Sequence, residues 1–340
     1  MSQTAWTGPA GHRRDYEITD LVPIEGGQGF VFRGRLRSTR LGPELDGAEV
    51  ALKQLASRGV RDGATAGPDP ALDSVLRARV HPGLARQIEV FLGPAPDGGQ
   101  AGVGVGDGDA GDGDGLVYVV SGWVDGRPLR QAARGQPLAA QLRWVRQLAE
   151  AIDFLHAEGP GHPAVVHRDV KPGNVLVTAT SDAVLIDPGL ARLAAAGATS
   201  TPHGSPGFIP PECRADPTAS GPAGDRWQLG ATLATLVLGD PPGAAEPDEV
   251  RSLLARRLAS THRSWPLAEA MAAMLDPDPG RRPARATDWA VELVALERLT
   301  RRRYPAPGRR RAGRRRVEAP PGRRGRPTPQ RVAMTLAATA

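Results

Sequence analysis

Residues 167–177 read His-Arg-Asp-Val-Lys-Pro-Gly-Asn-Val-Leu-Val. This stretch contains Lys171, one of only two lysines in a chain with 41 arginines, and Asn174, the sole asparagine in 340 residues. A solvated surface rarely requires Lys rather than Arg, but Lys is a compact point charge and Arg is a rigid planar fork. Asn offers a neutral carbonyl oxygen that can bind a hard cation. We therefore expect Lys53, Lys171 and Asn174 to be retained for their chemistry.

Further motifs accompany this stretch in a definite order. Upstream, Val50-Ala51-Leu52-Lys53 places the other lysine in a β-rich run, and Asp187-Pro188-Gly189 begins thirteen residues after Asn174. Pro210-Pro211-Glu212 and residues 278–283 (Asp-Pro-Gly-Arg-Arg-Pro) follow. Each motif alone is weak evidence. Together, their order and spacing over roughly residues 16–299 resemble the bacterial eukaryotic-like (Hanks-type) serine/threonine protein kinase family.

This resemblance implies an α+β fold with a β-rich first lobe, a helical second lobe and an ATP cleft between them. It also implies ATP and Mg²⁺ as cofactors and protein substrates as partners, with transfer of the γ-phosphoryl group. Asp169 would orient and deprotonate the acceptor hydroxyl, Lys171 would sit beside the transferring phosphate, and Lys53 would reach the α/β-phosphates. Asn174 and Asp187 would hold the magnesium ions. A lysine two residues after Asp169 resembles the Ser/Thr class rather than the tyrosine class.

The same resemblance places the nucleotide site. The glycine loop, whose backbone N–H groups would approach the phosphates, would be formed by Ile24, Glu25, Gly26, Gly27, Gly29 and Val31. Ser121 would be a small gatekeeper, and backbone groups of Gly122 and Val124 would bind adenine. Ala51 and Leu176 would close the apolar walls of the slot.

The resemblance also assigns the region between Asp187 and Glu212. Thr199, Ser200 and Thr201 are either phosphorylation sites of an activation loop or ordinary polar loop residues, and the sequence favours neither. Ser205 would belong to the peptide-binding floor. Glu212 would form a structural ion pair with Arg282. Asp225 would brace the catalytic loop.

Three departures from the family pattern keep a second function open. The position where a helical Glu should pair with Lys53 falls on Leu72, with the shorter Asp73 beside it. Ile24 replaces the first glycine of the loop, and Pro188 replaces the usual Phe. The alternative is a nucleotide-binding pseudokinase scaffold with weak or no transfer activity.

Along the chain, residues 1–14 are expected to be disordered, residues 15–299 to form the kinase domain, and residues 300–340 to form a disordered Arg/Pro-rich tail. The first lobe would span about 15–121 with a flexible Gly/Asp-rich insertion at 93–115, and the second about 122–299. Hydrophobic periodicity predicts strands at 17–23, 30–36, 49–55, 88–92, 116–120, 175–177 and 184–186. It predicts helices at 72–80, 138–157, 226–238, 248–258, 267–275 and 285–302.

The net charge of +6 conceals a division along the chain. Residues 301–340 hold 13 Arg and one Glu, so the rest of the chain carries about −6. The tail is thus a candidate for binding an anionic membrane surface or nucleic acid. No signal peptide and no membrane-spanning run is predicted, and a single cysteine, Cys213, suits a reducing compartment. We expect a cytoplasmic protein, membrane-associated if the native chain continues past Ala340.

Overall fold

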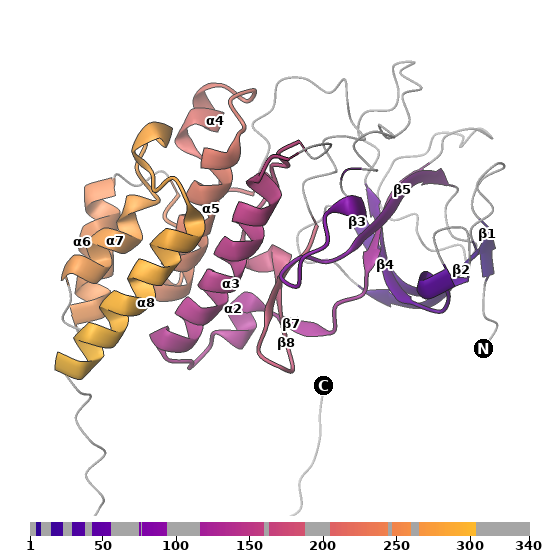
Figure 1. Cartoon of the computed structure of the whole chain (residues 1–340), viewed down its shortest axis with the longest axis horizontal. Helices are drawn as coiled ribbons and strands as arrows, with labels where there is room; N and C mark the ends of the chain where they lie inside the picture. Colours follow the sequence, from indigo (N-terminus) through magenta and orange to yellow (C-terminus); the bar gives the residue numbers. More distant parts are fainter. Residues whose placement is uncertain are drawn as a thin grey trace, which may run out of the picture. The chain divides into compact units, whose positions relative to one another are not determined.

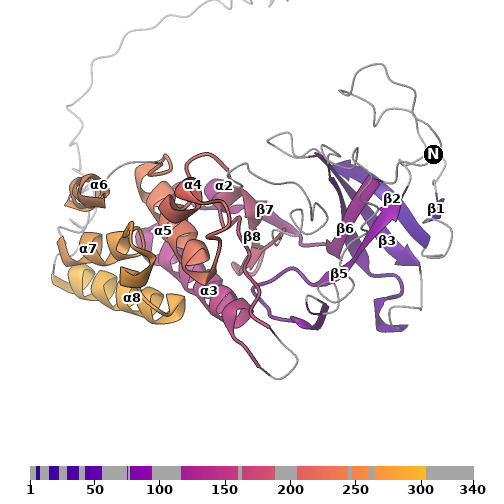
Figure 2. The same cartoon turned by 90° about the horizontal axis from the view of Figure 1, so that it is seen from above.

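The computed structural model describes residues 5–7, 15–22, 29–37, 43–55, 75, 77–93, 116–159, 163–187, 205–243, 247–259 and 265–303. Structural statements below concern these residues. Strands gather in one lobe and most helices in another (Figures 1 and 2). The expected α+β fold with two lobes is therefore present.

The first lobe is a six-stranded antiparallel sheet in the order β1-β2-β3-β4-β6-β5. Its strands are β1 (Ala5–Thr7), β2 (Asp15–Val22), β3 (Gly29–Arg37), β4 (Glu49–Leu55), β5 (Gln87–Gly93) and β6 (Leu116–Gly122). Side chains alternate between the two faces of a strand. In β4, Leu52 and Gln54 are buried on one face, whereas Ala51 and Lys53 are half-buried on the other. The sheet therefore presents Lys53 on the face opposite to the core of Tyr16, Phe32 and Tyr118.

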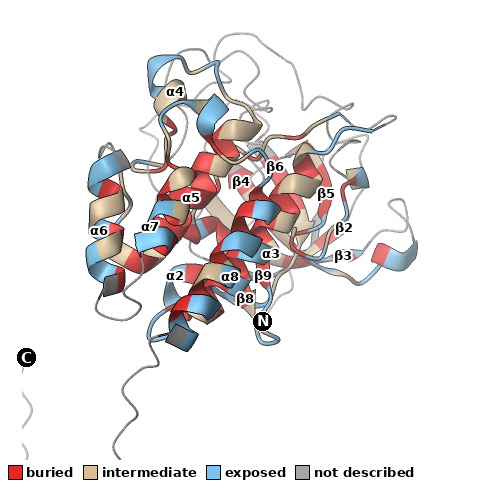
Figure 3. Cartoon of the chain, turned by 60° about the vertical axis from the view of Figure 1, so that its left-hand side comes forward, coloured by how far each residue is buried: buried red, intermediate tan, exposed pale blue. Residues whose placement is uncertain are grey.

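The second lobe is built around two long helices, α3 (Leu138–His156) and α5 (Pro222–Leu238). Figure 3 shows both as mostly buried, while the outer helices expose one side. On α3 the buried apolar residues recur every three or four positions, which places them on one face. The outer helices are α2 (Leu129–Ala132), α4 (Pro211–Ala215), α6 (Pro247–Ala259), α7 (Trp265–Ala273) and α8 (Ala286–Arg303). None of the described helices is long and apolar enough to cross a membrane.

A small sheet contains β7 (Gly126–Pro128), β8 (Val175–Thr178) and β9 (Ala183–Leu185), of which β8 and β9 follow residues 167–174, the predicted catalytic loop, and precede Asp187. Short 3-10 turns lie at η1 (Pro43–Leu45), η2 (Pro172–Asn174) and η4 (Pro279–Arg281). The turn η2 leads directly from the catalytic loop into β8. Because β8 pairs with β9, the residues on either side of this hairpin are brought together.

Arg79 connects the end of the helical segment around Val75–Ala78 to the second lobe. Its guanidinium donates hydrogen bonds to the carbonyl oxygens of Phe154 (3.1 Å), Ala157 (2.8 Å) and Pro163 (2.8 Å). These carbonyls lie at and just beyond the C-terminus of α3, where a helix leaves acceptors unsatisfied. Arg79 therefore caps α3 from the first lobe.

Most predicted elements are confirmed with boundary shifts of a few residues, but two expectations about the ends of the domain were wrong. Within the segment expected to be disordered, Ala5–Thr7 forms β1, since the outer edge of β2 offers unpaired N–H and C=O groups. The disordered tail was expected to start at residue 300 and the last helix to end at Arg302. Instead, α8 continues to Arg303. There Thr300 donates to the carbonyl of Leu296 and Arg301 approaches Glu297, which extends the last turn.

Within the predicted helix at 72–80, the described residues Val75, Arg77 and Ala78 are helical, whereas Arg79 and Val80 are not. Leu72 and Asp73 lie outside the described residues. The same holds for the insertion after Gly93, for Pro188 and for the tail after Arg303.

Candidate active site

Asp169 lies at the centre of a compact cluster of side chains. Lys171 Nζ donates to its Oδ2 at 2.8 Å, and Asn174 Nδ2 donates to the same oxygen at 2.8 Å. Asn174 Nδ2 also donates to the backbone carbonyl of Asp169 at 2.8 Å. Ser205, from a distant segment, donates to Oδ1 at 3.4 Å and accepts from Lys171 Nζ at 2.5 Å. The structure thus brings together the predicted catalytic residues Asp169 and Lys171, the predicted metal ligand Asn174 and the predicted floor residue Ser205.

A second charged pair joins the two lobes. Lys53 Nζ on β4 lies 2.7 Å from Oδ2 of Asp187, just beyond β9. The side chains are 14 % and 25 % exposed, so the pair is only partly shielded from water. Asp187 has a φ of 55°, in the left-handed region that non-glycine residues rarely adopt. Such backbone strain is often found at functional sites.

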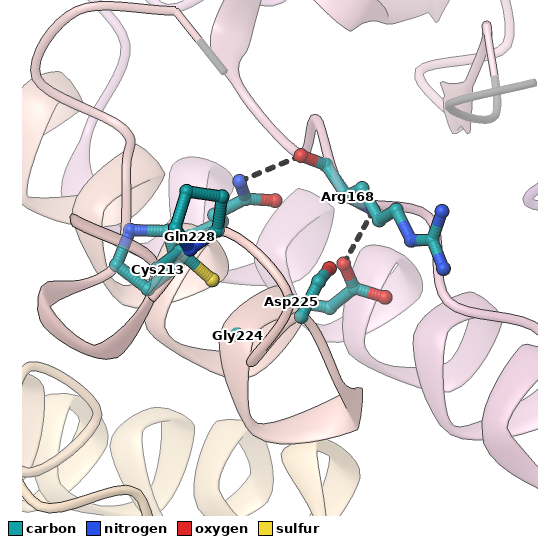
Figure 4. Close-up of a pocket in the computed structure, with 8 residues that line it drawn as sticks. Arg168, Cys213, Gly224, Asp225 and Gln228 are labelled. Atoms are coloured by element: carbon teal, nitrogen blue, oxygen red, sulfur yellow. Dashed lines mark hydrogen bonds between the residues drawn. The ribbon is translucent and has the colours of Figure 1, made fainter. Parts of the chain in front are cut away.

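Asp225 supports the catalytic loop from α5, as the sequence predicted. Its carboxylate is buried and accepts hydrogen bonds from the backbone N–H groups of His167 (2.7 Å) and Arg168 (2.6 Å). His156 Nε2 lies 2.8 Å from the same carboxylate. Figure 4 shows Asp225 and Gln228 reaching from α5 toward Arg168. Arg168 itself has a φ of 69°, and these contacts hold it in that strained conformation.

His167 is fully buried between the catalytic loop and the Asp187 segment. Its Nε2 lies 3.2 Å from the carbonyl of Ile186, and its Nδ1 accepts from the N–H of Asp169 at 3.4 Å. This arrangement requires a neutral ring with the proton on Nε2. Burial lowers the pKa of His167, and the surrounding carboxylates of Asp225 and Asp169 oppose that shift in part.

The oxygen atoms of Asp187 and Asn174 fit a magnesium ion. The N–H of Ile186 donates to the backbone carbonyl of Asn174 at 2.9 Å, which holds the two segments side by side. Asn174 makes its side-chain contacts with Asp169 through Nδ2, and Asp187 contacts Lys53 through Oδ2. No described residue donates to the other side-chain oxygen of either residue, Oδ1. No cluster of three acidic, His or Cys side chains suited to a metal occurs in the described part of the chain. Mg²⁺ is usually held by one or two carboxylates together with substrate phosphates, so this donor set suits it.

Four of the predicted nucleotide residues lie on one face of the first-lobe sheet: Val31, Ala51, Lys53 and Ser121. Val31 on β3 pairs directly with Lys53, and Ala51 pairs with Ser121 on β6. The chain leaves β6 after Gly122, and no described residue accepts from the N–H of Val124, the predicted adenine contact. Leu176 lies half-buried on β8. Gly29 begins β3, whereas Ile24, Glu25, Gly26 and Gly27 lie outside the described residues.

The segment that starts at Ser205 is held in place by buried polar contacts. Arg282, whose side chain is fully buried, donates to both carboxylate oxygens of Glu212 at 2.7 Å, which confirms the predicted pair. Gly207 has a φ of 86°, and a Cβ there would approach Pro241 to 2.8 Å. Only glycine fits this turn without strain. Thr199, Ser200 and Thr201 lie outside the described residues.

Sequence reasoning missed two groups at the site, His156 and Gln228. Both act through contacts with residues more than 50 positions away in the chain. The signal available for Gln228 was its spacing of three residues from Asp225, which places both side chains on one face of α5.

Known proteins resemble this chain in sequence and in fold. Residues 113–294, more than half of the chain, match the protein kinase domain family. A putative cyclin-dependent kinase F-2 of rice is 35% identical over 161 residues, covering 44% of this chain and 47% of that protein. The serine/threonine-protein kinase PknK of Mycobacterium bovis is 35% identical over 166 residues, covering 45% of this chain and 14% of that protein. The chain thus spans less than half the length of these curated relatives.

Solved structures of the same fold cover more of the chain. The PknI kinase domain of Mycobacterium tuberculosis superimposes with a TM-score of 0.55 at 19% identity, covering 87% of this chain and 99% of that chain. The pseudokinase domain of BIR2 superimposes with a TM-score of 0.54 at 18% identity, covering 82% of this chain and 81% of that one. At such identities the likeness concerns the fold alone. By its sequence match and its fold, the chain belongs to the protein kinase domain family.

Proposed function

We propose that this chain is an active serine/threonine protein kinase that transfers the γ-phosphoryl group of ATP to hydroxyl groups of protein substrates. The observation that carries the proposal is the cluster of Asp169, Lys171 and Asn174, with Lys53 and Asp187 paired beside it. The relative PknK, which is named a serine/threonine-protein kinase, supports the class. The lysine two residues after Asp169 supports Ser/Thr acceptors.

In the proposed reaction, the oxygen of the acceptor hydroxyl forms a bond to the γ-phosphorus, and the bond from that phosphorus to the β–γ bridging oxygen breaks to give ADP. Asp169 orients the hydroxyl and accepts its proton. Lys171 neutralises charge on the transferring group, and its contact with Ser205 ties that charge to the peptide-binding segment. Lys53 contacts the α/β-phosphates. Asp187 and Asn174 would hold Mg²⁺, which would supply positive charge to offset that of the phosphates.

The activation-loop assignment of Thr199, Ser200 and Thr201 is part of the same proposal. It is supported by Arg168, whose Nε is buried without a hydrogen-bond partner among the described residues. The backbone N–H of Arg168 is fixed by Asp225 at 2.6 Å, one residue before Asp169. A phosphate on a neighbouring segment would give this cation a strong two-point partner.

The test is incubation with labelled ATP and magnesium, followed by mapping of phosphosites by mass spectrometry. Asp169→Asn is expected to lower transfer by about 10²–10⁴-fold, with ATP affinity nearly unchanged because the carboxylate acts on the acceptor. Asp288→Asn, exposed on α8, is the matched control and should retain activity. Phosphate found only outside residues 190–205 would contradict the activation-loop assignment.

The alternative is a pseudokinase scaffold. It is favoured by the missing Glu at residue 72 in the sequence. Nucleotide binding by calorimetry without transfer to any hydroxyl, in the wild-type chain as in Asp169→Asn, would establish this alternative.

A further inference from the structure

Gln228 lies on α5, one turn after Asp225, and its side chain is only 2 % exposed. Its Oε1 accepts a hydrogen bond of 2.8 Å from the N–H of Val170. Its Nε2 donates one of 2.9 Å to the carbonyl of Arg168, drawn as a dashed line in Figure 4. These two backbone groups stand on either side of Asp169. A single carboxamide therefore fixes both peptide groups that flank this residue.

The second proton on Nε2 is also used. It is donated to the carbonyl of Phe208 at 3.1 Å, in the segment that follows Ser205. The orientation of the carboxamide is set by its partners, because exchanging its oxygen and nitrogen would place NH₂ against an N–H and oxygen against two carbonyls. Gln228 thus has one acceptor and two donors matched to three backbone groups in a buried site.

These contacts close a ring between the catalytic loop and the peptide-binding segment. The N–H of Phe208 donates to the carbonyl of Ser205 at 2.9 Å. Ser205 accepts from Lys171 at 2.5 Å, and Lys171 donates to Asp169 at 2.8 Å. One connection passes through the partly buried side chains of Asp169, Lys171 and Ser205, and the other passes through the neutral, buried carboxamide of Gln228. The second connection is shielded from water, where hydrogen bonds are stronger.

We infer that Gln228 is a positioning residue that holds the backbone around Asp169 and couples it to the Phe208 segment. The expected effect on the rate of transfer rests on the proposed function, whereas the expected effect on the backbone around Asp169 does not. Loss of the carboxamide leaves three buried backbone groups unpaired, so the loop is expected to shift away from its productive geometry. Displacements of about 1 Å at a catalytic group can cost about 10²-fold in rate.

The test compares Gln228→Met, which keeps the length of the side chain and removes all three bonds, with Gln141→Met. Gln141 is also a buried glutamine, 9 % exposed, and its Nε2 donates to the backbone carbonyl of Gln136, which precedes α3. It lies near the N-terminal end of α3, whereas His156 at the other end contacts Asp225. Hydrogen exchange read by mass spectrometry should increase at residues 166–172 and 205–210 in Gln228→Met alone. Unchanged exchange at both segments, or an equal increase in Gln141→Met, would overturn the inference.

Kinetics on a peptide substrate give the second readout. Gln228→Met should lower kcat by about tenfold to 100-fold with the KM for ATP little changed, whereas Gln141→Met should keep wild-type kcat. A wild-type chain without transfer activity would end the proposed function, and the exchange result would still decide the role of Gln228. A kcat equal to that of the wild type in Gln228→Met would overturn the positioning role.

Gln228→Glu keeps the test decisive if the Met variant does not fold. The buried carboxyl should stay protonated at low pH, because burial raises the pKa of a carboxyl group. The protonated carboxyl keeps an oxygen that accepts from the N–H of Val170, and its O–H can donate to one of the two carbonyls. As pH rises through the raised pKa, ionisation removes the donor, so activity relative to the wild type should fall between roughly pH 6 and pH 9. A pH-independent ratio close to one would contradict the inference.

Discussion

The guanidinium of Arg282 donates two parallel hydrogen bonds of 2.7 Å to the carboxylate of Glu212, which lies 70 positions earlier in the chain. The Arg282 side chain is completely buried and also donates to the carbonyls of Ala223 and Asp276. The pair therefore joins three segments of the helical lobe. Removing one member of such a pair leaves an uncompensated charge inside the protein.

The first prediction concerns this pair. Glu212→Gln should lower the free energy of unfolding by about 3–5 kcal/mol, measured by urea denaturation. Arg281→Gln is the matched control, since the neighbouring Arg281 is 74% exposed and lies 3.5 Å from Asp276. An exposed pair of that kind contributes at most about 1 kcal/mol. Equal losses in the two variants would contradict a structural role for burial of the pair.

The second prediction concerns Lys53. Lys53→Arg keeps the charge but replaces a compact ammonium with a planar fork, so phosphoryl transfer should fall by about 10²-fold or more. The charge that faces Asp187 is kept, so the substitution should change stability by no more than about 1 kcal/mol. The measurements are kcat/KM for ATP and the midpoint of urea unfolding. A variant that unfolds but retains activity per folded molecule would show that Lys53 is structural.

The third prediction is a pH dependence that originates at His167. Because burial lowers the pKa of this ring in the folded state, the unfolded chain binds its proton more readily. The stability contributed by the neutral ring is fully present above the unfolded pKa of about 6.5 and is lost as pH falls through the lower folded pKa. His167→Gln should therefore unfold with a weaker acid dependence than the wild type below about pH 6.5.

Urea unfolding at a series of pH values provides the check on His167. The control is His81→Gln, because burial also lowers the pKa of His81 and its carboxylate neighbour Glu150 opposes the shift. Both variants should flatten the acid slope. Only His167→Gln should also reduce transfer at neutral pH, since His167 Nδ1 is the acceptor for the N–H of Asp169. Parallel slopes for His167→Gln and the wild type would contradict the prediction.

The site was predictable from sequence where its parts lie close together in the chain. Asp169, Lys171 and Asn174 fall within six residues, so the hydrogen bonds among them follow from one local turn. The family resemblance indicated separate roles for Lys53 and Asp187, but the contact between them, which spans 134 positions, was not predicted. Gln228 carries no motif of its own. Its role depends on the packing of α5 against a loop about 60 positions earlier, and single-sequence periodicity does not contain that information.

Strand boundaries show the same limit. The alternation of apolar and polar residues predicted β4 at Glu49–Leu55 to the residue. By contrast, β1 has only three residues, too few for a period of two to be visible, and it forms because the edge of β2 is available. Pairing with a remote partner decides such short strands.

The fourth prediction concerns the basic tail, for which we propose an electrostatic role separable from catalysis. Ten arginines and one glutamate lie in residues 304–340, and the chain divides into two units at Tyr304. Near an anionic bilayer each Arg could contribute about 1 kcal/mol, screened over about 8 Å at physiological salt. Deletion of residues 304–340 should leave peptide phosphorylation unchanged and remove salt-sensitive binding to vesicles that contain phosphatidylserine.

The control for the tail is a variant with all ten arginines changed to lysine, which keeps the charge and should keep the binding. A parallel titration with duplex DNA distinguishes the two anionic surfaces, because preferential binding to DNA at equal salt would assign the tail to nucleic acid. Vesicle binding that persists in 1 M salt, where the screening length is about 3 Å, would show that charge is not its basis. Loss of kinase activity on deletion would show instead that the tail contributes to the catalytic domain, because the remaining chain ends beyond α8 with every described active-site contact retained.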